Sequence, residues 1–268
     1  MTGISENNWE QDARDILSEP LGWRPLRGEQ IAPGSGERES WDDLLIRPRL
    51  LEALRRLNPA VPALYLQQAV AEIAAPKSQD AITENQRIHK LFIEGFSLTY
   101  IDADGVEQNP RIRLLGARPE ENDWLAVNQV TIRQRDLHRR FDLVLYVNGM
   151  PLSIVELKKA GSASTGVAPA HAQLQTYLRE FPMAFRFCVF TLASDGLDAK
   201  YGTPFTPLNH FAPWNVDDDG ARLAYPRVEG GVSVEPLDDA LTGLYNQERF
   251  LQLVRNFTAF DEGANGLE

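Results

Sequence analysis

The segment that decides the fold runs Arg140-Phe141-Asp142-Leu143-Val144-Leu145-Tyr146-Val147-Asn148-Gly149-Met150-Pro151-Leu152-Ser153-Ile154-Val155-Glu156-Leu157-Lys158. Two apolar runs flank Asn148-Gly149, a pair that is typical of a tight turn between antiparallel strands. Asp142 opens the first run, and Glu156 and Lys158 close the second. Because a carboxylate inside an apolar strand is costly without a partner, the pattern predicts two strands whose acids bind a metal.

The length of the turn decides whether the two acids share a face of the sheet. A strict two-residue turn pairs residue 147 with residue 150 and leaves Asp142 opposite Val155. A three-residue loop pairs residue 147 with residue 151, which sets Asp142 opposite Glu156 with Lys158 on the same face. Gly149 can supply the left-handed residue that such a loop requires. We therefore expect a three-residue loop or an equivalent bulge.

These residue types suit hydrolysis of a phosphodiester. Asp142, Glu156 and the main-chain carbonyl of Leu157 are the expected ligands of Mg²⁺, a hard cation that prefers oxygen ligands and for which Mn²⁺ can substitute. A bound metal polarises a phosphate and lowers the pKa of a water molecule. Lys158 would orient that water or help to deprotonate it, and would stabilise the developing charge. The alternative is an exposed ladder of ion pairs, which the apolar flanks disfavour.

Composition limits the class of protein. The chain has 268 residues, of which 43% are hydrophobic, and this suits one large α/β domain with or without a smaller appendage. No apolar run reaches the roughly 18 residues that suggest a membrane span, and residues 1–10 lack the apolar core of a signal peptide. The single cysteine, Cys188, lies in an apolar run. A cytoplasmic protein is therefore expected.

The net charge of −11 argues against a domain that binds nucleic acid tightly on its own, because phosphate contacts require clustered Lys and Arg. A candidate basic patch lies just before Asp142. Its members are Arg133, Arg135, His138, Arg139 and Arg140. The alternative, which the sequence leaves open, is a solvated loop that happens to carry several arginines.

Periodicity and turn residues predict alternating helices and strands, hence an α/β sandwich. The expected helices are 1–19, 40–57, 62–75, 80–95, 169–181 and 237–260. The expected strands besides the hairpin at 141–157 are 96–101, 112–116, 124–132 and 187–192. Irregular structure is expected at 20–38, 161–166 and 194–236. We expect residues 1–79 to form a helical arm that packs on the core, residues 80–260 to form the core, and residues 261–268 to form a tail or the start of a linker.

Several motifs of this sequence resemble those of a known family. Asp142, Glu156-Leu157-Lys158 and the pair Gln173 and Tyr177, which share a helix face, resemble the PD-(D/E)xK nucleases that carry a downstream Q-x-x-x-Y. More narrowly, residues 20–260 resemble the N-terminal part of the restriction (motor) subunit of type I restriction–modification enzymes. The residues that carry this likeness are Leu21-Gly22-Trp23, Leu54 to Pro59, Asn85 with His89 and Gly95, Asn148 to Leu152, Glu156 to Lys159, and Ser194-Asp195-Gly196.

The resemblance implies a restriction-endonuclease-like core, with a mixed central sheet flanked by helices, that cuts double-stranded DNA without sequence specificity of its own. It implies that methyltransferase and specificity subunits are partners, and that ATP acts only through a helicase-like motor. The chain contains no Gly-Lys pair and hence no phosphate-binding P-loop. We therefore expect the nuclease domain of a longer protein, with the motor lying beyond the linker.

The resemblance also assigns supporting residues. Gln173 and Tyr177 would position the metal ligands or the DNA backbone, and helix packing is the alternative for this pair. Either Glu84 or His89 would come near the metal, and a helix cap or surface charge is the alternative for each.

Two other functions remain open from the sequence. One is a stand-alone PD-(D/E)xK DNA nuclease, which the negative charge disfavours. The other is a non-catalytic docking module that retains the nuclease fold and links the motor to the methyltransferase core.

Overall fold

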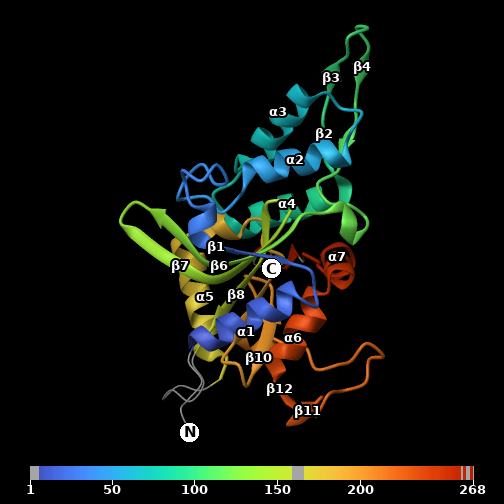
Figure 1. Ribbon diagram of the computed structural model, residues 1–268. Helices are drawn as coiled ribbons and strands as arrows, with labels where there is room; N and C mark the ends of the chain where they lie inside the picture. The colour runs from blue at the N-terminus through green and yellow to red at the C-terminus, as the bar shows by residue number, and fades with distance from the viewer. Residues whose placement is uncertain (1–5, 159–165, 261, 264–265, 268) are drawn as a thin grey trace.

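A mixed six-stranded sheet forms the centre of the domain in a computed structural model, which describes residues 6–158, 166–260, 262–263 and 266–267 (Figure 1). The strand order is β1-β6-β7-β8-β9-β10. The pairs β1–β6 and β8–β9 are parallel and the other neighbours are antiparallel. The strands are β1 Arg24–Arg27, β6 Trp124–Gln134, β7 Leu137–Val147, β8 Met150–Leu157, β9 Phe190–Ser194 and β10 Ala199–Gly202.

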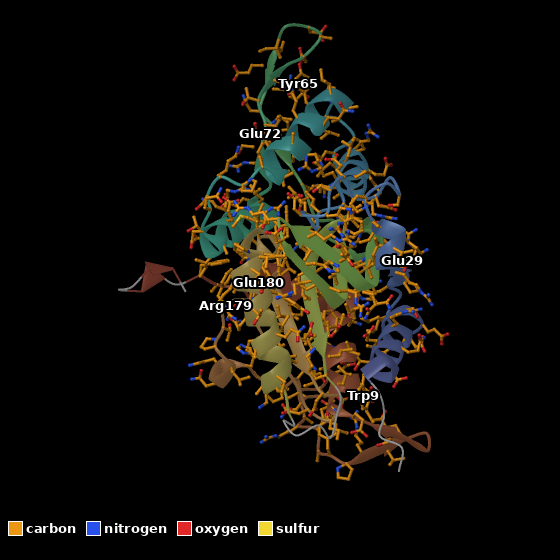
Figure 2. The ribbon with its side chains drawn as sticks, turned by 90° about the vertical axis from the view of Figure 1, so that its left-hand side faces the viewer. Trp9, Glu29, Tyr65, Glu72, Arg179 and Glu180 are labelled. Carbon is orange, nitrogen blue, oxygen red and sulfur yellow. The ribbon has the colours of Figure 1, made fainter. Side chains whose placement is uncertain are left out.

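Helices cover both faces of this sheet. They are α1 Glu6–Ser18, α2 Arg47–Leu57, α3 Ala63–Ala74, α4 Ala81–Glu94, α5 Ala168–Glu180, α6 Pro236–Tyr245 and α7 Gln247–Asn256. Figure 2 shows α5, with Arg179 and Glu180, on the opposite side of the strands from α1, with Trp9. None of the described helices has the length and apolarity needed to cross a membrane.

Short elements complete the domain. Two-stranded pairs are formed by β2 Phe96–Ser97 with β5 Arg111–Ile112, β3 Tyr100–Ile101 with β4 Glu107–Gln108, β11 Arg227–Glu229 with β12 Val232–Val234, and β13 Glu262–Gly263 with β14 Gly266–Leu267. The 3₁₀ turns are η1 Gly28–Ile31, η2 Pro119–Glu121, η3 Pro182–Phe185 and η4 Leu208–His210. The β3–β4 pair and α3 project together at one end of the molecule (Figure 1).

Two apolar clusters, one on each face, hold the sheet between its helices. Leu143, Leu145 and Val147 of β7 pack in the cluster that includes α1, α6 and α7, whereas Val144 and Tyr146 pack in the cluster that includes α5. Every residue of β8 is buried. The strands that carry Asp142 and Glu156 are therefore central, and an exposed ladder of ion pairs at this position is wrong.

The N-terminal region departs from expectation. Residues 24–27, expected to be irregular, form an edge strand parallel to β6, so part of the expected arm belongs to the central sheet. The helix expected from residue 40 begins only at Arg47, where Pro48 occupies the first turn, a position that tolerates proline because its N–H group needs no partner there. The domain boundaries themselves stay a prediction.

The C-terminal half also differs. The helix expected over 237–260 is two helices that meet at Asn246, whose side chain accepts a hydrogen bond from the Arg249 N–H and begins α7. The expected strand 187–192 lies at 190–194, and the segment expected to be irregular contains β10 and the β11–β12 pair. The expected loop at 161–166 lies outside the described residues except for Gly166, as do parts of the expected tail.

Candidate active site

A β-bulge brings the two acids of the central hairpin to the same level. Asn148 and Gly149 have φ values of 53° and 77°, which form the two-residue turn with left-handed residues that suits a hairpin. Val147 pairs with Met150 and Tyr146 with Pro151, but Leu145 pairs with Ser153, which leaves Leu152 without a partner on β7. Continuing this register past Leu143 and Val155 sets Asp142 opposite Glu156. The expected three-residue loop is therefore wrong, and the equivalent bulge is confirmed.

Close packing fixes the turn that starts this register. A β-carbon added to Gly149 would lie 2.4 Å from the carbonyl oxygen of Ile46, so only glycine fits. The Ile46 N–H donates to the Gly149 carbonyl at 2.9 Å. The buried side chain of Asn148 accepts from the Asp123 N–H and donates to the Leu114 carbonyl, at 2.8 and 2.9 Å. The turn is thus held by α2 and by the loop before β6.

The carboxylates lie in a buried, incompletely satisfied arrangement. Glu156 is fully buried and Asp142 is 8% exposed. The Leu157 N–H donates to Asp142 Oδ2 at 2.9 Å, and Lys158 Nζ donates to Glu156 Oε1 at 2.5 Å. Glu156 Oε2 has no hydrogen-bond partner within the described part of the chain. Because a buried oxygen without a partner is costly, this atom marks a place where a cation or a donor from a substrate fits.

The raised pKa of Glu156 also indicates a place for a cation. Burial, and then the neighbouring charge of Asp142, raise the pKa of Glu156 to about 9, and Lys158 opposes this shift. Without a bound cation, this shift favours the protonated form of Glu156, and a hydrogen bond between the Glu156 and Asp142 carboxyl groups adds to it. A cation placed between the two carboxylates would favour their charged forms.

Gln173 and Tyr177 fasten α5 to β7 next to Asp142. The Tyr177 hydroxyl donates to the Arg140 carbonyl at 3.1 Å, and Gln173 Nε2 donates to the Tyr177 oxygen. The Tyr177 ring meets Phe141 edge-on, with ring centres 4.8 Å apart. Burial, followed by the charge of Glu156, raises the pKa of Tyr177, so it stays a phenol. These contacts hold the main chain two residues before Asp142.

Glu84 and His89 make their contacts elsewhere. Glu84 accepts from the N–H groups of Lys77 and Ser78, each at 2.8 Å, and pairs with Arg87 at 2.8 Å. It therefore fixes the turn before α4. The His89 ring packs on Phe92 and Phe260, and burial lowers its pKa. Among the described residues, neither side chain hydrogen-bonds or forms an ion pair with the hairpin.

Asp195 is a polar residue near the site for which sequence reasoning supplied no role. It is buried, and its Oδ2 accepts from the Gly166 N–H at 2.6 Å while its Oδ1 accepts from the Asp198 N–H at 2.8 Å. It follows Ser194, whose carbonyl accepts from the Lys158 N–H at 2.9 Å. Asp195 thus connects the end of β9 with the residues that lead into α5. The available signal was an Asp-Gly pair directly after an apolar strand.

The basic segment before Asp142 forms the end of the long β6–β7 hairpin and not a separate loop. Arg133 stacks on Trp41, with its guanidinium carbon 4.4 Å from the ring centre, and Arg139 pairs with Glu180 at 2.7 Å. Arg135 lies in the turn with a φ of 53°. Arg140 borders a cleft beside the sheet, and Arg135 lines a smaller pocket together with Glu180.

The fold and this hairpin define an α/β domain with two adjacent carboxylates and a lysine on neighbouring central strands. The model of the family described as type I restriction enzyme R protein N terminus matches residues 3–210, and the chain belongs to that family.

Individual relatives agree with this assignment. The chain is 29% identical over 270 residues to the type I restriction enzyme HindI endonuclease subunit of Haemophilus influenzae, an alignment that covers 98% of this chain and 25% of that protein. It is 26% identical over 258 residues to the "Putative type I restriction enzyme MjaIXP endonuclease subunit" of Methanocaldococcus jannaschii, covering 90% of this chain and 24% of that protein. The chain thus spans about a quarter of the length of these curated relatives.

Proposed function

We propose that this domain is a metal-dependent endonuclease with a PD-(D/E)xK core, which hydrolyses phosphodiester bonds of double-stranded DNA without reading their sequence. The observation that carries the proposal is the buried pair Asp142 and Glu156, with Glu156 Oε2 lacking a partner among described residues. Membership of the R-subunit family supports it.

The donor set fits Mg²⁺, or Mn²⁺ in its place. Among the described residues, no group of three or more His, Cys, Asp and Glu side chains is arranged to hold a metal. Two carboxylates and the Leu157 carbonyl nevertheless suit Mg²⁺, which is usually bound by one or two carboxylates and keeps several waters. When bound, such an ion polarises the phosphate and activates a water.

Each residue of the site would then have its own role. Asp142 and Glu156 hold the cation, and the Leu157 N–H fixes the orientation of the Asp142 carboxylate. Lys158, on the same side of β8 as Glu156, would orient the attacking water and stabilise charge on the phosphate. Gln173 and Tyr177 keep β7 in place through the Arg140 carbonyl.

We also propose that other components of a larger complex hold the DNA. The net charge of −11 means that tight DNA binding requires other components. We assign these to an ATP-driven motor in the longer protein and to the methyltransferase and specificity subunits of a type I complex.

The test is calorimetric titration with Mn²⁺ and Mg²⁺ of the wild type, Asp142→Asn, Glu156→Gln and Glu180→Gln. Glu180 is a matched control, because its Oε2 also lacks a partner in the described residues but it pairs with Arg139 and not with a second acid. We expect the two hairpin variants to abolish binding and the control to retain it. Binding that ignores both hairpin variants would refute the metal site and favour a docking role.

A further inference from the structure

A cleft of about 520 Å³ lies on the α1 side of the sheet. This is the face opposite to Glu156, because its neighbours Val155 and Leu157 both pack in the α1-face cluster. Segments far apart in the sequence build the cleft, namely α1, the end of β1 with η1, β6 and β7. The residues that matter below are Arg14, Arg27, Arg140, Asn128, Gln129 and Glu10. The cleft is therefore a product of the tertiary fold.

An irregularity in the sheet turns Arg140 toward this cleft. Gln129 has a φ of 58° and lies in β6 across from Asp142, between the pairs Asn128–Leu143 and Val130–Phe141. Leu143 packs in the cluster on the α1 face, but Phe141 packs in the cluster on the α5 face. The alternation of β7 is thus displaced at Asp142, and Arg140 borders the cleft together with α1.

The neighbouring turn is adapted to this irregularity. A β-carbon added to Gly28 would lie 2.1 Å from the Gln129 carbonyl oxygen, so the start of η1 can approach β6 only as glycine. Gln129 Nε2 donates to Glu10 Oε2 of α1 at 2.5 Å. The turn at Gly28, strand β6 and helix α1, which all line the cleft, are therefore held against one another.

The cleft offers unused donors. Within the described residues, none of the guanidinium groups of Arg14, Arg27 and Arg140 lies within ion-pair distance of a carboxylate. Arg14 Nε and Asn128 Oδ1 are buried atoms that have no hydrogen-bond partner in the same part of the chain. Glu10 and Glu29 also line the cleft, which leaves three cations against two acids in a chain of net charge −11. An anion would satisfy these groups.

We propose that this cleft binds the sugar–phosphate backbone of DNA away from the scissile bond, on the other face of the sheet, through Arg14, Arg27 and Arg140. The proposal rests on the proposed nuclease function. Contacts to phosphates carry no sequence information, which suits a nuclease that does not choose its site.

The test compares two triple variants of the same charge in their binding of a short fluorescent DNA duplex, followed by anisotropy in EDTA over a salt series. The cleft variant is Arg14→Gln, Arg27→Gln and Arg140→Gln. The control variant is Arg55→Gln, Arg111→Gln and Arg118→Gln, whose parent side chains are exposed and line none of the cleft. Both variants are first checked for cooperative thermal unfolding.

Each phosphate contact contributes about 0.9 to the slope of log affinity against log salt, so three contacts contribute about 2.7. Between about 50 and 200 mM salt, the affinity of the wild type and of the control should therefore fall about 40-fold more than that of the cleft variant. Equal slopes for all three proteins, or no binding by the wild type at low salt, would overturn the cleft assignment. Neither result touches the metal site, because no metal is present and Asp142 and Glu156 are unchanged.

Discussion

Replacement of Gly149 by alanine tests the turn on which the register of the hairpin depends. Gly149 and Gly105 have almost the same backbone angle, with φ values of 77° and 78°. An added β-carbon at Gly149 would lie 2.4 Å from the Ile46 carbonyl oxygen and 2.9 Å from the Arg49 β-carbon, whereas at Gly105 it would meet nothing within 4 Å. A comparison of Gly149→Ala with Gly105→Ala therefore separates the energetic cost of the left-handed backbone from the cost of the steric collision, which occurs only at residue 149.

The expected magnitudes follow from these two terms. A left-handed conformation costs an L-residue roughly 1–2 kcal/mol, and this applies to both positions. Forcing a methyl group into a packed site costs about 1–3 kcal/mol more, and this applies only at residue 149, where the obstacle is main chain. We therefore expect Gly105→Ala to lower the free energy of unfolding by about 1–2 kcal/mol, and Gly149→Ala by about 2–5 kcal/mol.

Urea unfolding followed by circular dichroism measures both variants, with the m value showing whether the transition stays comparable. Calorimetric titration with Mn²⁺ is then applied to the folded proteins. Because Gly149 starts the register that sets Asp142 opposite Glu156, Gly149→Ala should also weaken metal binding, while Gly105→Ala should leave it unchanged. Equal losses of stability in the two variants would refute the reasoning that close packing at Ile46 fixes the turn.

Three further predictions concern single side chains. Tyr177→Phe keeps the ring on Phe141 but removes the hydrogen bond to the Arg140 carbonyl, so urea unfolding should show a loss of about 1 kcal/mol; an unchanged free energy of unfolding would contradict this. Burial lowers the pKa of His89, so the unfolded chain binds the proton first and stability is lost as the pH falls below about 6.5. His89→Phe should make the melting temperature less sensitive to acid between pH 7 and 5, and identical pH profiles would disprove the assignment. Glu156 has a pKa raised from 4.5 to about 9, so the stability contributed by its protonated form is complete below about pH 4.5 and is lost as the pH rises from there through about 9. Without metal, Glu156→Gln should therefore be more stable than the wild type at pH 7, by up to about 3 kcal/mol, and a less stable variant in urea would count against this.

The sequence predicted the parts of the fold that depend on local pattern. Asn148-Gly149 between apolar runs is a strong local signal for a hairpin, and the helical spacing of Gln173 and Tyr177 correctly placed them on α5. The strand β1 could not be predicted, because its Arg24–Arg27 sequence is short, mostly exposed and charged at both ends. Only pairing with β6 makes it a strand. The break between α6 and α7 was missed because the apolar spacing continues across Asn246, which acts as a cap.

The sequence predicted the positions of some site residues and not of others. Chemistry required Asp142 and Glu156 on one face and so demanded a bulge, but nothing in the local sequence says that Leu152 is the bulged residue. Glu84 and His89 could not be assigned, since helix periodicity does not determine which side chain a distant loop will engage. The arginine cleft was beyond sequence reasoning, because Arg14, Arg27 and Arg140 come together only when α1 packs beside the sheet.

Two departures from regular strand geometry bracket Asp142, and each changes the direction of a different side chain. The bulge at Leu152 brings Glu156 level with Asp142 on one neighbouring strand. The left-handed residue Gln129, on the other neighbouring strand, accompanies the displaced alternation that gives Arg140 to the cleft. A non-glycine residue in that conformation costs of order 1–3 kcal/mol, and bulges are enriched beside active sites because they re-aim side chains. A strand with unbroken alternation would send Phe141 to the α1 face and Arg140 to the α5 face, so the strained geometry lets one strand supply a buried acid and an adjacent exposed cation.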